Sequence, residues 1–401
     1  MTDAYIFDAI RTPRGKGREG GALNKCPPVF LTATLINAMI SRNQVDEKNI
    51  GDLILGCVTQ VGEQGGNVAK VAALSSGLSA STPGITLNRY CTSGLDACNF
   101  AAMKIMANVD DLVLAGGVEA MSRVPMLSDR ASFYTDERVM REAKFVPMGI
   151  AADLIASLFQ ISREECDRYA VESQRRAAQA QSSGAFRNSL IPVVVDEKES
   201  VVTIDETIRG NTSETDLATL NPLYSDFGKQ NYESMLMSYF NDLSNMRYVH
   251  HIGNSPGIVD GAALALIGSK ASGEINGLKP RAKIVAMSNV ASDPMLALTG
   301  GIDAAAAVLT KAGMTKDDID LVEFNEAFAA TSIKFLRDGG WSADQLNVNG
   351  GAISMGHAMG ATGASLLGII LDELESRQLS TGLISVSGAA GVGTAMVVER
   401  V

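Results

Sequence analysis

Two parts of the 401-residue chain share the same order of segments, and this duplication constrains the fold more than any other feature. In the first part, residues 31–45 have the pattern of an amphipathic helix, and residues 46–58 follow as an acidic turn and a β-rich apolar run. In the second part, residues 302–315 and 316–328 repeat that order. The chain is therefore expected to contain two copies of one α/β unit.

The correspondence between the two parts continues beyond these segments. Residues 85–108 have the pattern of a strand, a sharp turn and a helix, and residues 346–374 repeat it. The apolar run at 111–124 is similar to the run at 382–401. Apolar strands that alternate with helices predict parallel sheets with helices on both faces.

Residues 1–122, resumed at 250–277, form the first predicted unit, and residues 278–401 form the second. Between them, residues 123–249 break the pattern and are richer in charge, Met, Asn and Ser. They contain one clear helix within 162–184, which has a Ser N-cap, a Glu three residues later and a closing Gly. We interpret this segment as an insertion domain, and such insertions commonly carry ligand contacts.

Composition excludes several classes of partner. The net charge of −11 argues against binding to nucleic acid or to an anionic membrane surface. No run of about 18 apolar residues is present, so we expect no membrane span. The first residues lack the apolar core of a signal peptide. Five cysteines without regular spacing indicate reduced thiols, which predicts a cytoplasmic protein.

Cys91 and His357 are the strongest candidates for chemistry. Cys91 stands where a strand gives way to a helix, and the free N–H groups of a helix N-terminus stabilise a thiolate. His357 lies within 350–363, where five of fourteen residues are glycine, and we expect this segment to let a ligand approach the backbone closely. A thiol with a distant histidine suffices for covalent acyl transfer. The other cysteines are expected to be inert: Cys26, Cys57, Cys98 and Cys166.

Two further motifs carry polar groups. Asn325 stands at the carboxyl end of an apolar strand, where ligands collect in α/β folds, and can position a water, donate to an oxyanion or cap the next helix. The glycine-containing loop within 385–395 is expected to place backbone N–H groups near a bound carbonyl. His250 and His251 are adjacent on an extended segment and point to opposite faces, so no shared metal site is expected, and no zinc-ligand spacing is present.

Together these motifs resemble the thiolase family over nearly the whole chain. NRYCTSGL is similar to the nucleophile motif, FNEAFA to the asparagine motif, GGAISMGHAMGATGA to the histidine motif and SGAAGVG to the final glycine loop. The resemblance implies an α/β fold of five α-β-α-β-α layers made from two duplicated halves, with residues 123–249 covering coenzyme A (CoA). It also implies a homodimer or homotetramer.

The activity that the resemblance implies is acyl transfer between CoA thioesters. The reaction is either thiolytic cleavage of 3-ketoacyl-CoA or the reverse condensation of two acyl-CoA units. Coenzyme A is then a substrate or product, and no separate cofactor is expected.

The resemblance also implies roles for individual residues. Cys91 takes the acyl group. His357 activates the thiol and, with a water held by Asn325, stabilises one thioester oxygen. The N–H groups of Cys91 and Ala389 form a second oxyanion hole. The residues expected to contact substrate or CoA are Met148, Ser255 and Phe328.

Three positions depart from the family pattern. Ser387 stands where thiolases usually carry a second cysteine as acid and base. Ala358 replaces the proline that usually follows the histidine, and Pro256 follows Ser255, which displaces the serine expected beside the pantetheine. The first departure affects carbon–carbon chemistry, because a serine hydroxyl is a poorer proton shuttle than a thiol near neutral pH.

Three functions remain open at this point. The first is an active thiolase that uses Ser387, or a water positioned by it. The second is a relative that forms an acyl-enzyme on Cys91 but completes hydrolysis or transfer to another acceptor. The third is a non-catalytic CoA-binding or assembly subunit, which the joint presence of Cys91, Asn325 and His357 argues against.

Two groups of residues have candidate roles in substrate binding. One group can line an acyl pocket, although we expect core packing for it: Met235, Met237, Tyr239 and Phe240. Residues 123–147 hold five Lys/Arg and four Asp/Glu, so their charge is nearly balanced. The basic residues there are candidates for the CoA phosphates: Arg123, Arg130 and Arg138.

Overall fold

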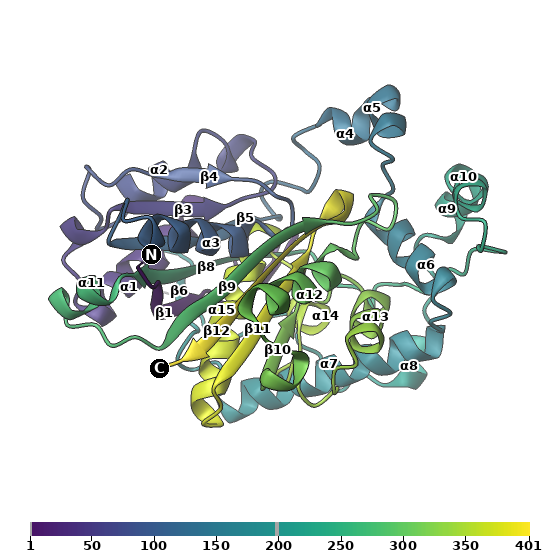
Figure 1. The fold of residues 1–401 in the computed structure, drawn as a ribbon. Helices are drawn as coiled ribbons and strands as arrows, with labels where there is room; N and C mark the ends of the chain where they lie inside the picture. The colour runs from purple at the N-terminus through teal and green to yellow at the C-terminus, as the bar shows by residue number, and fades with distance from the viewer. Residues whose placement is uncertain (1, 197–199) are drawn as a thin grey trace.

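Ten strands form one continuous sheet in the computed structural model, which describes residues 2–196 and 200–401 (Figure 1). We call its parts in the two halves the first and the second sheet. Neighbouring strands follow the order β4-β3-β5-β8-β1 and continue as β9-β12-β11-β10, while β2 pairs with β8. The strands of the first sheet are β1 (Tyr5–Arg11), β2 (Gly15–Lys16), β3 (Asp52–Gly56), β4 (Ile85–Leu87), β5 (Leu112–Ala120) and β8 (Val259–Gly268). Those of the second are β9 (Ala282–Ala291), β10 (Leu321–Phe324), β11 (Thr381–Ser387) and β12 (Val392–Arg400).

Helices fill three layers around these sheets. The helices of the duplicated halves are α1 (Pro28–Asn43), α2 (Val68–Leu74), α3 (Ser93–Met106), α11 (Lys270–Ile275), α12 (Gly300–Ala312), α13 (Ala329–Gly339), α14 (Ala352–Met355) and α15 (Met359–Ser376). Side chains of α1 and α2 share one buried cluster with β3, β5 and β8. Those of α3 and α15 form a second cluster between the two sheets, and α12 covers the outer face of β11 and β12. The expected α/β fold of five layers is confirmed.

The expectation of parallel sheets is correct only in part. β3 runs parallel to β4 and β5, and β10 runs parallel to β11. In contrast, β8 is antiparallel to β1 and β5, and β12 is antiparallel to β9 and β11. A connection of four residues, 388–391, joins β11 to β12, and so short a link permits only antiparallel pairing. The strand expected near residue 346 is a single bridge between Val322 and Leu346.

The two halves meet at β1 and β9, where Tyr5 pairs with Lys283. β8 returns from beyond the insertion and lies between β1 and β5. Across this junction, the Arg281 guanidinium lies 3.6 Å from Asp8 of β1, and within the second half it bonds Asp372 and Glu375. These pairings fit the division into 1–122 with 250–277, 123–249 and 278–401, which stays a prediction.

The insertion is mostly helical and partly protrudes in Figure 1. Its elements are α4 (Ser132–Thr135), α5 (Glu137–Glu142), α6 (Met148–Leu158), α7 (Arg163–Ser183), β6 (Val193–Val194), β7 (Val201–Val202), α8 (Glu214–Ala218), α9 (Ser225–Asn231) and α10 (Glu233–Tyr239). The caps expected for α7 are confirmed: Ser162 and Glu165 form a capping box, and Gly184 closes the helix in the left-handed region.

Core packing was the wrong expectation for most of α10. Met235, Met237 and Tyr239 are exposed, because α10 lies in the protruding α9–α10 pair and buries only the opposite side of the helix. Phe240 packs against the core of the insertion, as expected. Within the described residues, no helix combines the length and the apolar character needed to cross a bilayer.

Candidate active site

Cys91 occupies a sharp corner between β4 and α3. Tyr90, directly before it, has a φ of +51°, a conformation that is costly for a residue with a side chain. Asn88 accepts the Tyr90 N–H at 2.8 Å, and the Ser93 hydroxyl accepts the Arg89 N–H at 2.8 Å. These bonds hold the strained corner. Cys91 is partly exposed, whereas the other four cysteines are buried.

A buried carboxylate ties this corner to the second half of the chain. Asp96, in the first turns of α3, accepts a hydrogen bond from Arg89 at 2.5 Å. It also accepts from Asn289 on β9 at 2.6 Å and from Thr394 on β12 at 3.0 Å. Two strands of the second half therefore help to set the position of the Cys91 corner.

Glycines bring the His357 corner directly against the Cys91 corner. A Cβ atom on Gly94 would lie 2.5 Å from the carbonyl oxygen of Gly360, and one on Gly363 would lie 2.5 Å from the Leu95 nitrogen. Helices α3 and α15 thus touch through their backbones. We expected these glycines to admit a ligand, and this expectation is wrong for Gly360 and Gly363, because their open sides are filled by protein.

The ring of His357 is held in one tautomer. Its Nδ1 lies 2.8 Å from the Thr362 hydroxyl, which donates its own proton to the Ala358 carbonyl at 3.0 Å. The hydroxyl must therefore accept from Nδ1–H, and this network assigns a bare Nε2. Nε2 is buried and has no hydrogen-bond partner among the described residues. Burial, helped by Arg14, lowers the pKa of His357 to about 3, so the ring is neutral and Nε2 is free to accept a proton.

The thiol of Cys91 is also held neutral. Burial, followed by the nearby Glu119 carboxylate, raises the pKa of Cys91 to about 12, although a backbone hydrogen bond opposes the shift. We expected the helix N-terminus to favour a thiolate, and the opposite direction results because desolvation outweighs it. The Cys91 thiol and the His357 imidazole are therefore both neutral at rest and form no ion pair.

Glu119 is a structural support that the sequence analysis did not single out. It is fully buried on β5 and accepts the Gly360 N–H at 2.9 Å, next to the start of α15. It also accepts the N–H groups of Val58 at 3.0 Å and Thr59 at 3.1 Å. Burial raises its pKa, while these bonds oppose that shift. A carboxylate inside an apolar strand, in AGGVEA, was the available signal.

Asn325 follows β10 directly, and its N–H donates to Ser385 on β11 at 2.9 Å. Both atoms of its side-chain amide are buried without a partner among the described residues. The helix that follows begins at Ala329 with Phe328 at the N-cap, so Asn325 does not cap it. A buried amide without partners suits a bound ligand or water.

Glu326 links the Asn325 segment to the His357 segment. Its carboxylate accepts the Ile353 N–H of α14 at 2.9 Å and the Ser173 hydroxyl of α7 at 2.8 Å. The sequence placed Glu326 beside Asn325 but did not indicate this role, because Ile353 and Ser173 are distant in the chain. Through Glu326, the insertion and the second half hold one corner together.

Ser387 ends β11 and is fully buried. Its hydroxyl accepts the Gly301 N–H at 2.9 Å, so it is directed toward the start of α12. Ala389 lies in the turn that follows, beside Ala390, whose φ is +57°. A Cβ atom on Gly388 would lie 3.2 Å from Cβ of Tyr90, so this loop packs against the Cys91 corner.

Of the three residues expected to contact CoA, Met148 lies in the insertion, whereas Ser255 and Phe328 lie outside it. Met148 packs against the buried cluster that contains Phe328. The Phe328 ring meets the His250 ring edge-on, with centroids 5.2 Å apart. The hydroxyl of Ser255 is buried and has no partner among the described residues.

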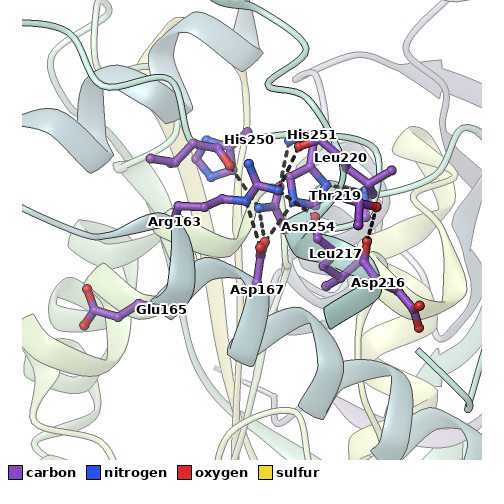
Figure 2. Close-up of polar contacts among 12 residues, drawn as sticks. Arg163, Glu165, Asp167, Asp216, Leu217, Thr219, Leu220, His250, His251 and Asn254 are labelled. Atoms are coloured by element: carbon purple, nitrogen blue, oxygen red, sulfur yellow. Dashed lines mark hydrogen bonds and ion pairs between the residues drawn. The ribbon is translucent and has the colours of Figure 1, made fainter. Parts of the chain in front are cut away.

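Figure 2 shows how His250 and His251 hold the segment before Ser255. His250 Nδ1 contacts Asp153 at 2.7 Å, and its Nε2 accepts the Ala330 N–H at 3.3 Å. His251 Nε2 contacts Asp167 at 2.8 Å, and Asp167 also binds Arg163 and Asn254. The two rings contact different carboxylates, on α6 and α7.

The arginines suggested for the CoA phosphates already have acidic partners in two cases. Arg123 forms two hydrogen bonds with Glu63, at 2.6 and 2.7 Å. Arg138 pairs with Glu142 one helical turn away at 2.9 Å.

Two surface hollows, of about 700 and 260 Å³, do not include these arginines. The larger is lined by residues of α7 and α15, and the smaller by residues around Ser292 and Lys334.

Comparison with known proteins identifies the family. Residues 4–231 match the thiolase N-terminal domain, and residues 278–400 match the thiolase C-terminal domain. The chain belongs to the thiolase family. It is 39% identical to 3-oxoadipyl-CoA/3-oxo-5,6-dehydrosuberyl-CoA thiolase of Escherichia coli (strain K12), over 100% of both chains.

Two further thiolases extend the comparison. The chain is 36% identical to an acetyl-CoA acetyltransferase of Chromobacterium violaceum, over 99% of this chain and 100% of that one. The crystal structure of the Bacillus anthracis acetyl-CoA acetyltransferase superposes with a TM-score of 0.86 at 30% identity, and covers 100% of this chain and 99% of that chain. The protein is thus a thiolase-type acyltransferase.

Proposed function

We propose that the protein transfers acyl groups between coenzyme A thioesters through an acyl intermediate on Cys91. It cleaves 3-ketoacyl-CoA with CoA, or condenses two acyl-CoA units. One observation carries the proposal: the bare, buried Nε2 of His357 lies on a corner whose backbone packs against the Cys91 corner. A positioned base beside a thiol is the requirement for nucleophilic acyl transfer.

The first half-reaction of cleavage follows from this pair. The Cys91 proton passes to Nε2 of His357 while sulfur bonds to the 3-keto carbon. The bond between C2 and C3 then breaks, leaving the acyl group on sulfur and an electron pair on C2 of acetyl-CoA, which takes up a proton. Because both resting groups are neutral, transfer of the Cys91 proton to His357 must be concerted with formation of the bond between sulfur and the substrate carbonyl carbon.

The developing negative oxygen needs donors. We assign one set to His357, after its Nε2 has taken the Cys91 proton, and to a water held by the free amide of Asn325. The other set consists of the backbone N–H groups of Cys91 and Ala389. The strained residues beside these N–H groups, Tyr90 and Ala390, support the second assignment, since strain of this kind clusters at functional sites.

In the second half-reaction, the thiol of free CoA attacks the acyl-cysteine, gives up its proton and releases Cys91. We propose that Ser387, or a water it positions, serves in this proton transfer. Its hydroxyl already accepts the Gly301 N–H and is turned toward α12. This contact favours a second candidate function, in which acylation of Cys91 is efficient but carbon–carbon bond formation is slow and hydrolysis or transfer to another acceptor prevails.

The insertion, residues 123–249, is proposed to cover CoA, with Met148, Ser255 and Phe328 along its pantetheine arm. We also propose a homodimer or homotetramer. Apolar side chains are exposed on the edge strand β4 and on helix α3, at Ile85, Phe100 and Met103, and such residues support an interface between subunits.

We propose a reducing, cytoplasmic location, which the five free cysteines support.

A coupled assay with acetoacetyl-CoA and free CoA tests the proposal, together with mass spectrometry of the Cys91 peptide after mixing with acetyl-CoA. Turnover with an acetyl mass on Cys91 is expected, and Cys91→Ala should lose both signals. Cys166→Ala, which removes a buried thiol in α7, is the control and should keep both. An unmodified Cys91 in an active protein would refute the acyl-cysteine.

A further inference from the structure

Arg14 is a buried cation whose hydrogen bonding is incomplete. It lies between β1 and β2 and is 2% exposed. Its Nη1 donates to the carbonyl oxygen of Gly356 at 3.0 Å, while Nη2 has no partner among the described residues. Since a buried charge is costly, an arginine kept at such a position indicates a function for its charge.

The acidic groups near Arg14 do not cancel its charge. Asp205 accepts the Arg14 backbone N–H, but its carboxylate is engaged by both terminal nitrogens of Arg11, each at 2.8 Å. Glu323 on β10 is buried, and burial together with Glu326 raises its pKa well above the usual range, which favours its neutral form. Burial lowers the pKa of Arg14 only to about 10, so the guanidinium stays charged near neutral pH.

Arg14 donates its hydrogen bond to the peptide unit that joins Gly356 to His357. The carbonyl of this peptide belongs to Gly356 and accepts from Arg14, while its N–H belongs to His357 and donates to Gly257 at 2.9 Å. Gly356 has a φ of +84°, and a Cβ atom there would lie 2.2 Å from Val259. Both sides of the peptide plane are therefore fixed, which sets the direction of the imidazole.

We propose that Arg14 is the positioning residue of His357: its guanidinium fixes the peptide before the histidine and thereby directs Nε2 as the proton acceptor. The assignment rests on the proposed role of His357 as base. Arg14 does not touch the substrate and acts through His357 alone.

The neighbouring elements bring several titratable groups to this corner: Arg14 from the β1–β2 turn, the Cys91 thiol, Glu119 from β5 and Glu323 from β10. Of these, Arg14 is the one whose charge lowers the pKa of His357. Removing the cation should raise that pKa toward, but not to, its usual value near 6.5, because the burial remains. The protonated fraction at mildly acidic pH then increases, and the acid limb of the acylation rate moves to higher pH.

The test compares Arg14→Met with Arg14→Lys in the full chain. Single-turnover acylation of Cys91 by acetyl-CoA is measured from about pH 4 to pH 8. For Arg14→Met we expect at least a tenfold loss near neutral pH, the scale of a displaced general base, and an acid limb shifted upward. Arg14→Lys keeps the charge, so this variant, like the parent with its His357 pKa of about 3, should show no acid limb within the measured range.

A second readout is independent of catalysis. The chain has only three histidines, so NMR of protein labelled at histidine Cε1 yields three signals, with His357→Ala assigning one. The His357 signal should titrate at higher pH in Arg14→Met than in the parent. Arg281→Met, which removes a largely buried arginine elsewhere, is the control for general destabilisation and should leave this signal unchanged.

The outcomes separate the two proposals. An unshifted His357 signal and acid limb in Arg14→Met would overturn the role of Arg14, as would an equal shift in Arg281→Met. If Arg14→Met does not fold, Arg14→Gln replaces it as the uncharged variant against Arg14→Lys. A parent protein that never acylates Cys91 would contradict the proposed function, while the NMR comparison still decides whether Arg14 controls His357.

Discussion

The Cys91 corner and the His357 corner occupy corresponding places in the two halves, yet opposite charges surround them. A buried carboxylate, Glu119, contributes to the raised pKa of Cys91, whereas a buried guanidinium, Arg14, contributes to the lowered pKa of His357. Each neighbour favours the neutral form of its partner. The comparison indicates that the duplicated scaffold places the two groups, while residues unique to each half set their charge states.

Of the changes that test this comparison, removal of the base should have the largest effect on the rate of acylation. His357→Ala is expected to slow acylation of Cys91 by about 10²–10⁴-fold, the usual worth of a general base. Binding of CoA, measured by calorimetry, should persist, because the insertion residues are untouched. Acylation at the parent rate in this variant would remove His357 from the mechanism.

The next effect concerns the carbon–carbon step. Ser387→Cys should raise the rate of condensation by more than about tenfold, a conservative fraction of the contribution of a positioned acid–base group, and leave acylation nearly unchanged. Ser385→Cys is the matched control, since its side chain lies on the same face of β11 and contacts Gly301 as well. If Ser387→Cys condenses no faster than the parent, the serine is an adapted residue and another group carries the proton.

A smaller effect is expected from the tautomer lock. Thr362→Val removes the acceptor of Nδ1–H but keeps the shape of the side chain. Acylation should fall by about fivefold, which corresponds to one hydrogen bond of about 1 kcal/mol. Single-turnover rates check this, and Ser365→Ala, one turn further along α15, serves as the control. A variant as fast as the parent would show that packing alone orients the ring.

The last prediction concerns the order in which the five thiols are labelled, which does not depend on the rate of catalysis. At limiting iodoacetamide, Cys91 should be labelled before the other cysteines, because it alone among the five is partly exposed. Since its pKa is raised to about 12, labelling should keep accelerating as pH rises above neutrality. Peptide mapping decides, and earlier labelling of Cys26 or Cys166 would contradict the expectation.

Local sequence patterns predicted the parts of the site that depend on neighbouring residues. The Cys91 corner, the position of Asn325 after β10 and the caps of α7 each follow from a few adjacent side chains. The resemblance to thiolases added the roles. These roles and the substrate-binding residues stay predictions, whereas the fold and the family are established.

Contacts between distant segments could not be predicted in the same way. Arg14 and Gly356 are separated by 342 positions, and nothing near either residue indicates their hydrogen bond. The glycines of the His357 segment were interpreted as space for a ligand, because the sequence does not show that Gly94 and Leu95 fill that space. The charge state of Cys91 was predicted in the wrong direction since desolvation depends on the whole fold.

The hydrogen bond between Asp96 and Thr394 spans 298 positions and reaches almost to the last residue. During synthesis, the corner that carries Cys91 leaves the ribosome long before its partner strand exists. A nascent or truncated chain can thus form α3 without a finished site, and its thiol is then exposed to solvent. In refolding experiments, recovery of activity should lag behind recovery of helical signal, because long-range pairing comes late.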